Sequence, residues 1–309
     1  LTGQIDVPYL DRDLGYIHEA RDQLNMLRAV SKAAFRIESA DTALATLREA
    51  AQVALTAPRG PVSVEIPIDV QKAEIDLPGS IELLNVQPMS LDEAALDQLA
   101  NRLAECKRPL LWLGGGTRNA TDACKRLVDL GFGVVSSTQG RGVIADSHPS
   151  NLGAFTAFAQ VEAFYETCDA MLVVGSRLRG NETLTYKLNL PKRLFRIDAD
   201  PARAHGEYIF EQFVHADAAQ ALDGLANKLE GRLKTDNAFG ADLATARREA
   251  ETFARDGLGP YNVLVDAVAD VAGESLVWVR DVTLLNSTWG NRLPALNAPR
   301  NGVHALGGG

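Results

Sequence analysis

Apolar and polar positions in the middle of the chain alternate between strand-like runs and helix-like stripes. Residues 109–113, Pro-Leu-Leu-Trp-Leu, form an unbroken apolar run that stops at three glycines, which is typical of a buried parallel strand opening into a turn. The same reasoning predicts strands at 132–135, 170–174 and 194–197, and helices at 90–103, 120–128 and 217–229. Ser90 and Glu93 fit a capping box at the start of the first helix. This alternation predicts an α/β, doubly wound domain with a mostly parallel sheet.

The two flanks of this domain carry shorter patterns. Residues 43–54 place apolar side chains at helical spacing, and residues 62–66 alternate between apolar and polar before Pro67 ends the strand. Residues 2–4 are interpreted as the end of a strand and 276–279 as a further strand. The predicted division is a first domain at 1–74, a linker at 75–89, a central domain at 90–231, a linker at 232–257 and a last domain at 258–309.

Composition and charge limit the class of protein. The 309 residues are 46% hydrophobic and carry a formal net charge of -9, which gives no basic face for DNA or RNA. No apolar run is long enough to span a membrane and no signal-peptide order is present, so we expect a cytoplasmic protein without membrane contact. Three widely spaced cysteines predict buried, reduced thiols, and the five histidines show no metal-ligand spacing.

Ligands of a doubly wound sheet bind at the carboxyl ends of its strands. The residues expected at that edge are Gly114, Gly115, Gly116, Gly175, Ser176, Arg177 and Asp198. Glycine allows a close approach by a phosphate-bearing cofactor, but it equally allows a tight turn with no ligand. The glycine cluster alone leaves both interpretations open.

Five segments in this order resemble the thiamine diphosphate-dependent enzymes that include acetolactate synthase, pyruvate oxidase and benzaldehyde lyase. They are Thr2-Gly-Gln4, the run Gly60-Pro-Val-Ser-Val-Glu-Ile-Pro-Ile-Asp-Val70, Arg108-Pro through Gly116, the pair Gly175-Ser-Arg177 and Ile197-Asp-Ala-Asp200, and Asp281-Val282 through Trp289 with Gly307-Gly-Gly309. The resemblance covers essentially the whole chain. It implies that a complete central domain is flanked by the C-terminal part of a pyrimidine-binding domain and the N-terminal part of a diphosphate-binding domain.

The resemblance also implies a function for the intact protein. Family members act on a 2-keto acid with thiamine diphosphate and Mg²⁺, as carboligases or decarboxylases, and assemble as homodimers or homotetramers. The family's catalytic glutamate lies upstream of residues 2–4, and its Gly-Asp-Gly magnesium motif lies beyond the terminal glycines. We therefore expect a chain truncated at both ends, and we expect the 309 residues alone to be inactive.

Several residues correspond to functional positions of the family. Gln4, Lys32 and Phe35 match positions near the active site and the substrate entrance. Contacts with the cofactor diphosphate are implied for Asp281, Asn286, Ser287, Thr288, Gly307, Gly308 and Gly309. Each has an alternative reading as a strand end, a solvated lysine or an ordinary turn.

FAD is a further possible cofactor, because acetolactate synthases and pyruvate oxidases hold it in the central domain. The corresponding residues are Gly114, Gly115, Gly116, Arg177 and Asp198. Gly153-Ala-Phe-Thr156 stands where those synthases have Gly-Met-His-Gly, so FAD binding stays open. The alternative function is a non-catalytic nucleotide-binding module, similar to NAD-binding deoxyhypusine-synthase-like domains, that uses the central domain alone.

Overall fold

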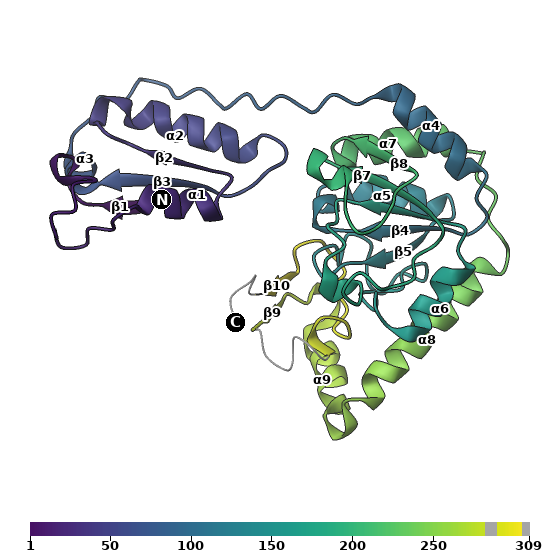
Figure 1. The fold of residues 1–309 in the computed structure, drawn as a ribbon. Coiled ribbons are helices and arrows are strands. Elements are labelled where there is room, and N and C mark those ends of the chain that lie inside the picture. Colours follow the sequence, from purple (N-terminus) through teal and green to yellow (C-terminus); the bar gives the residue numbers. More distant parts are fainter. Residues whose placement is uncertain (282–288, 305–309) are drawn as a thin grey trace. The chain divides into compact units, whose positions relative to one another are not determined.

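The computed structural model describes residues 1–281 and 289–304. The chain divides into two compact units, an N-terminal unit at Leu1–Met89 and a central unit at Ser90–Gly309 (Figure 1). Residues 73–92 between the last helix of the first unit and the first helix of the second contain no helix or strand. The five-part division predicted from the sequence stays a prediction. None of the described helices is long and apolar enough to cross a membrane.

The N-terminal unit is built on a three-stranded parallel sheet in the order β1-β3-β2. Its elements are β1 (Thr2–Gln4), α1 (Gln23–Val30), β2 (Ala33–Arg36), α2 (Ala40–Leu55), β3 (Val62–Pro67) and α3 (Ile68–Lys72). Helix α2 packs on β2 and β3. The buried apolar residues of this core are Ile37, Ala50 and Val64.

The central unit contains a five-stranded, fully parallel sheet in the order β5-β4-β6-β7-β8. Its strands are β4 (Pro109–Leu113), β5 (Gly133–Ser136), β6 (Ala170–Val174), β7 (Arg193–Asp198) and β8 (Gln212–His215). Its helices are α4 (Glu93–Ala104), α5 (Thr121–Asp129), α6 (Ala159–Thr167), α7 (Ala218–Leu229), α8 (Phe239–Asp256) and α9 (Val263–Ala272). A parallel pair, β9 (Trp278–Arg280) and β10 (Gly302–His304), follows. The predicted α/β class with parallel sheets is confirmed.

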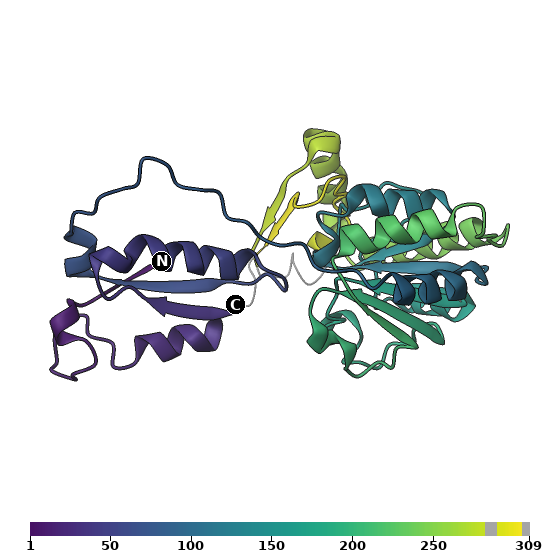
Figure 2. The same ribbon diagram turned by 90° about the horizontal axis from the view of Figure 1, so that it is seen from above.

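Helices cover both faces of the central sheet (Figure 2). Leu111 and Leu113 of β4 belong to one apolar cluster, together with residues of α4, α5 and α7. Leu110 and Trp112 belong to the other cluster, with residues of α6 and α8. Successive side chains of a strand point to opposite faces, so a strand covered on both faces must be apolar at every position. This accounts for the unbroken apolar run at 109–113.

Three details differ from the sequence expectations. Helix α4 is capped by Asp92, whose side chain accepts a hydrogen bond from the Ala95 amide, rather than by Ser90. The segment 232–257, expected as a linker, contains the 18-residue helix α8. Strands β2 and β8 and helix α6 were not predicted. Strands β2 and β8 were missed because they are short and lack a continuous apolar run. Helix α8 was missed because few of its residues are buried and apolar.

The three cysteines are free and buried, as predicted. Burial raises the pKa of Cys106 to about 11 and the pKa values of Cys124 and Cys168 to about 12. A thiol with so high a pKa is almost entirely protonated at neutral pH and is a poor nucleophile.

Candidate functional site

The strand order places a topological switch point between β4 and β6. β5 pairs with one side of β4, while β6 pairs with the other side and is followed outward by β7 and β8. In open parallel sheets, the crevice outside the carboxyl ends of the strands at such a point is the usual ligand site. The turn at Gly114 follows β4 and the turn at Gly175 follows β6, so the predicted residues of both turns are brought together.

These two turns pack directly against each other. The Gly114 amide donates to the Val174 carbonyl oxygen at 2.9 Å, and the Gly116 amide donates to the Gly175 carbonyl oxygen at 3.0 Å. A Cβ atom at Gly114 would lie 2.1 Å from the Gly175 oxygen, and one at Gly116 would lie 2.8 Å from the Gly175 Cα. Gly175 itself has a φ of +57°. These three glycines are therefore required by contact between the turns, and all three of their amides are already used within the chain.

Arginines surround this edge, and most have partners within the chain. Arg118 donates to the Gln139 carbonyl oxygen at 2.9 Å. Arg179 pairs with the buried Glu182 at 3.2 Å, and Glu182 also accepts the Thr138 amide at 2.9 Å. The Glu182 carboxylate thus links the loops that follow β5 and β6. Arg177 is exposed.

Asp198 lies at the end of β7, next to His215 of β8. Its Oδ1 accepts the Asp200 amide at 2.9 Å. Burial raises the pKa of Asp198, and this outweighs the lowering effects of that hydrogen bond and of nearby Arg196. Arg196 is buried beside the Phe210 ring, with 4.1 Å from Cζ to the ring centroid, and burial lowers its pKa to about 10.

The described residues do not favour FAD. A phosphate cradle needs open backbone amides, whereas the amides of Gly114 and Gly116 serve the packing of the two turns. The Glu182 carboxylate accepts the Thr138 amide, so this donor at the same edge is also used within the chain. Of the residues predicted for FAD, Gly115, Arg177 and Asp198 retain polar groups that a ligand could contact, since the Gly115 amide makes no hydrogen bond among the described residues.

The predicted catalytic residues lie in the N-terminal unit. Gln4 ends β1 and is buried, and its Oε1 accepts the Ile5 amide at 2.9 Å. Its Nε2 makes no hydrogen bond within the described residues. Lys32 precedes β2, and its ammonium group donates to the carbonyl oxygens of Val53 at 2.7 Å and Thr56 at 2.8 Å. Val53 lies in the last turn of α2 and Thr56 is the residue that follows the helix, so Lys32 caps the C-terminal end of α2.

Phe35 lies on β2 and packs against the small core of the N-terminal unit. The pairing of β2 and β1 with β3 places Phe35 beside Val64, and Gln4 beside Pro67. Phe35 and Gln4 therefore belong to strands on opposite sides of β3. This arrangement gives Phe35 a structural role in the sheet, whatever it contributes to a substrate entrance.

A buried charged group in the same unit was missed by sequence analysis. Glu65 of β3 is fully buried and is paired with Arg36, and Gln23 donates to its other oxygen at 3.1 Å. Arg36 also pairs with Asp11, and hydrogen bonds to Asp11 and Glu65 raise the pKa of Arg36. The alternation of 62–66 put Glu65 on the polar face of its strand and gave no sign that this carboxylate is buried. An arginine at the matching position of a neighbouring strand was the signal that could have corrected this.

The residues implied for diphosphate contact lie at the end of the chain. Asp281 follows β9 and is exposed. Asn286, Ser287, Thr288, Gly307, Gly308 and Gly309 lie outside the described residues. Burial, together with Arg141 and Arg292, lowers the pKa of Arg280 at the end of β9 to about 10. Within the described residues, no group of three or more His, Cys, Asp and Glu side chains could hold a metal ion.

Comparison with known proteins finds one family model that matches part of the central unit. The family model described as the thiamine pyrophosphate enzyme central domain matches residues 96–225, which run from α4 to α7. This match over the central unit supports the resemblance to thiamine diphosphate-dependent enzymes that the sequence indicated.

Its relatives include proteins named as acetolactate synthases and one named as a probable decarboxylase. The protein named "Probable 2-ketoarginine decarboxylase AruI" from Pseudomonas aeruginosa is 28% identical over 97% of this chain and 54% of its own length. The acetolactate synthase large subunit of Corynebacterium glutamicum is 30% identical over 65% of this chain and 33% of its own length. Acetolactate synthase isozyme 2 large subunit of Escherichia coli is 27% identical over 65% of this chain and 37% of its own length. The chain thus spans between a third and just over half of the length of these relatives.

Proposed function

We propose that the protein is a thiamine diphosphate-dependent enzyme that decarboxylates a 2-keto acid, or joins the resulting carbon unit to an acceptor carbonyl. The observation that carries this proposal is the similarity through 97% of the chain to a relative named as a 2-keto acid decarboxylase, which includes both units. Thiamine diphosphate, when bound, supplies an electron sink for the carbanion that is left after carbon dioxide departs. The protein's share is to bind, orient and manage protons.

Gln4 is the candidate that the geometry supports best among the three proposed catalytic residues. Its Oε1 is held by the Ile5 amide, which fixes the side chain and leaves Nε2 available as a donor. Lys32 has its ammonium group bound to the end of α2, and Phe35 packs in the core. We therefore propose Gln4 as a cofactor or substrate contact, and Lys32 and Phe35 as residues that act through the position of β2.

The cofactor set proposed for the intact protein is thiamine diphosphate with Mg²⁺, in a homodimer or homotetramer. Asp281, Asn286, Ser287, Thr288 and Gly307 to Gly309 are the proposed diphosphate contacts. FAD is not part of this proposal, because the glycine turns of the central sheet are packed on each other. Flavin absorbance in the purified protein would contradict that exclusion.

A second candidate for the substrate is a basic 2-keto acid. It is favoured by the extent of the match to the 2-ketoarginine decarboxylase, which covers 97% of this chain, against 65% for the two acetolactate synthases described above. The two candidate substrates are pyruvate, as for an acetolactate synthase, and the basic 2-ketoarginine. Carbon dioxide release from each, with and without thiamine diphosphate, distinguishes them. A cofactor-dependent preference for pyruvate, with acetolactate as product, would support the synthase-type reaction.

The assay compares the protein isolated from its source with the purified 309-residue chain. Because the chain spans only a third to just over half of its relatives, we expect cofactor-dependent turnover in the first sample and none in the second. Turnover by the 309-residue chain would contradict the expectation of inactivity and would leave the proposed reaction standing.

A further inference from the structure

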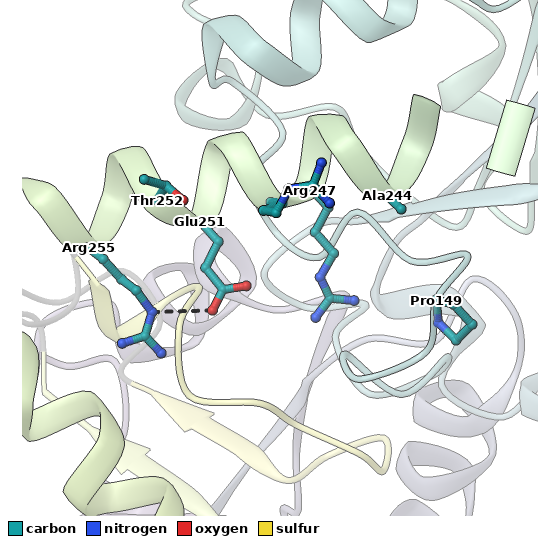
Figure 3. Close-up of a pocket in the computed structure, with 7 residues that line it drawn as sticks. Pro149, Ala244, Arg247, Glu251, Thr252 and Arg255 are labelled. Carbon is teal, nitrogen blue, oxygen red and sulfur yellow. Dashed lines mark hydrogen bonds and ion pairs between the residues drawn. The ribbon is translucent and has the colours of Figure 1, made fainter. Parts of the chain in front are cut away.

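A surface pocket of about 360 Å³ lies along α8, in the segment that sequence analysis treated as a linker (Figure 3). Its size suits a small-molecule ligand. It is lined by Pro149, Ala244, Arg247, Arg248, Glu251, Thr252 and Arg255. None of these lining residues is among those proposed for the thiamine-dependent reaction.

At one end of the pocket, the charge of Arg255 is paired within the chain. Arg255 donates from Nε to Glu251 at 3.3 Å, and from Nη1 to Asp266 of α9 at 3.0 Å and to Asn262 at 2.9 Å. Figure 3 shows the side chains of Glu251 and Arg255 directed toward each other. The two carboxylates carry two negative charges against the single positive charge of Arg255, so this end offers an anion no net positive charge.

The other end carries two arginines without an acidic partner. Arg247 donates from Nη1 to the carbonyl oxygens of His148 at 3.1 Å and Asn151 at 2.9 Å. These bonds fix its guanidinium group and leave Nε and Nη2 without a hydrogen bond to any described residue. Arg248 contacts Thr245 at 3.2 Å. In the part of the chain that the structure describes, neither arginine lies within ion-pair distance of a carboxylate.

Two small apolar groups border this positive end. Pro149 and Ala244 line the pocket on the side of Arg247, away from Arg255 (Figure 3). A guanidinium group presents several donors in a planar fork that matches the oxygens of a carboxylate or phosphate. Because Arg247 is already held in place by two carbonyls, little conformational freedom is lost when it binds such a group.

We propose that this pocket binds the oxyanion group of a small molecule, a phosphate or a carboxylate, at Arg247 and Arg248. The Glu251 carboxylate stays paired with Arg255 and faces the remainder of the ligand. This site is independent of the thiamine-dependent reaction, since it uses none of the residues proposed for that reaction. It takes a ligand on α8, which connects the central sheet to α9.

Isothermal titration of the purified protein at constant ionic strength tests the proposal, with inorganic phosphate in one arm and acetate in the other. We expect saturable binding of at least one anion. Stronger phosphate binding would assign a phosphate-bearing ligand, and stronger acetate binding would assign a carboxylate. Absence of saturable binding in both arms would overturn the proposal.

Arg248→Gln is the main variant, because Arg248 is exposed and contacts only the Thr245 hydroxyl among the described residues. We expect it to weaken binding about tenfold, the effect of losing a hydrogen bond between charged groups. Lys125→Gln, at an exposed position of α5 outside the pocket, is the control that removes the same charge and should leave affinity unchanged. Equal weakening by both variants would show a non-specific charge effect and would contradict the site. Arg247→Gln should abolish binding, and circular dichroism checks that it still folds.

Discussion

The two parallel sheets of this chain differ in how completely they are covered. In the central unit, every residue of β4 and β6 is buried, and helices pack on both faces. In the N-terminal unit, the buried apolar core contains Ile37, Ala50 and Val64, and α1 exposes Met26 and Val30. The central sheet is held by apolar packing on both faces. The smaller N-terminal sheet relies more on polar groups, such as the buried Glu65 and its partner Arg36.

The comparison predicts a large difference between two phenylalanines. Phe195→Ala on β7, where this ring is fully buried, should lower the free energy of unfolding by about 3–5 kcal/mol, because it removes buried contacts and leaves a cavity. Phe35→Ala on β2 should cost about 1–2 kcal/mol, because that ring is only partly buried. Chemical denaturation measures both. Equal losses would show that the small core is packed as completely as the large one.

Arg36→Gln examines the polar part of the N-terminal unit. The change leaves the fully buried Glu65 carboxylate without its charged partner, so we expect a loss of about 3 kcal/mol in unfolding free energy. The double variant Arg36→Gln with Glu65→Gln should recover much of this loss, since no buried charge remains. A double variant as unstable as the single one would place the effect in Arg36 packing or in its pair with Asp11.

Gly114→Ala examines the contact between the turns at the switch point. The new Cβ would lie 2.1 Å from the Gly175 carbonyl oxygen, so the turns must separate, at a cost of about 1–3 kcal/mol. Gly240→Ala on α8 is the matched control, because no atom lies within 4 Å of its Cβ position. Alanine is favoured over glycine in a helix by about 0.5–1 kcal/mol, so this control should stabilise the protein. Thermal unfolding distinguishes the two outcomes.

Asp198→Asn should have the smallest effect and the clearest pH dependence. Burial raises the pKa of Asp198, so the folded state holds its proton more tightly than the unfolded state. The stability from this group is complete below the unfolded pKa and is lost as pH rises through the folded pKa. Asparagine keeps the acceptor for the Asp200 amide, so the variant should be more stable at neutral pH by less than about 1 kcal/mol, a gain absent in acid.

Asp200→Asn provides a control of opposite sign. Burial works to raise the pKa of Asp200, but hydrogen bonds from the Ala202 amide and from Arg203 lower it overall. Its stabilising contribution is present above the unfolded pKa and is lost as pH falls through the folded pKa. Urea denaturation across the acid range should therefore show Asp200→Asn less stable than the parent protein at neutral pH. The same sign for both variants would contradict the assigned environments.

The sequence predicts the central sheet well where strands are buried on both faces. The run 109–113 could be located because every position must be apolar, and β4 has those bounds. β8 and β2 have four residues each and carry mixed side chains, so they offer no such run. Helix α8 could have been found from Phe239, Leu243, Ala246 and Ala250, which recur at helical spacing, but two of these are alanines within a strongly charged segment.

The candidate sites were less predictable than the fold. The position of the glycines at the carboxyl edge follows from strand order, but their contact with each other depends on the exact spacing of two turns. Lys32 and Glu65 are residue types that usually lie exposed to solvent. Lys32 instead caps α2, and Glu65 is buried beside Arg36. Such contacts join residues distant in the chain, and no local pattern specifies them.

Carbon dioxide release from a 2-keto acid by the protein isolated from its source, measured with and without added thiamine diphosphate and Mg²⁺, decides whether the protein is a thiamine diphosphate-dependent enzyme. We expect release that requires thiamine diphosphate and that does not require FAD. Absence of release from both pyruvate and 2-ketoarginine in the presence of the cofactor and Mg²⁺, by protein that is folded, would contradict the proposed function.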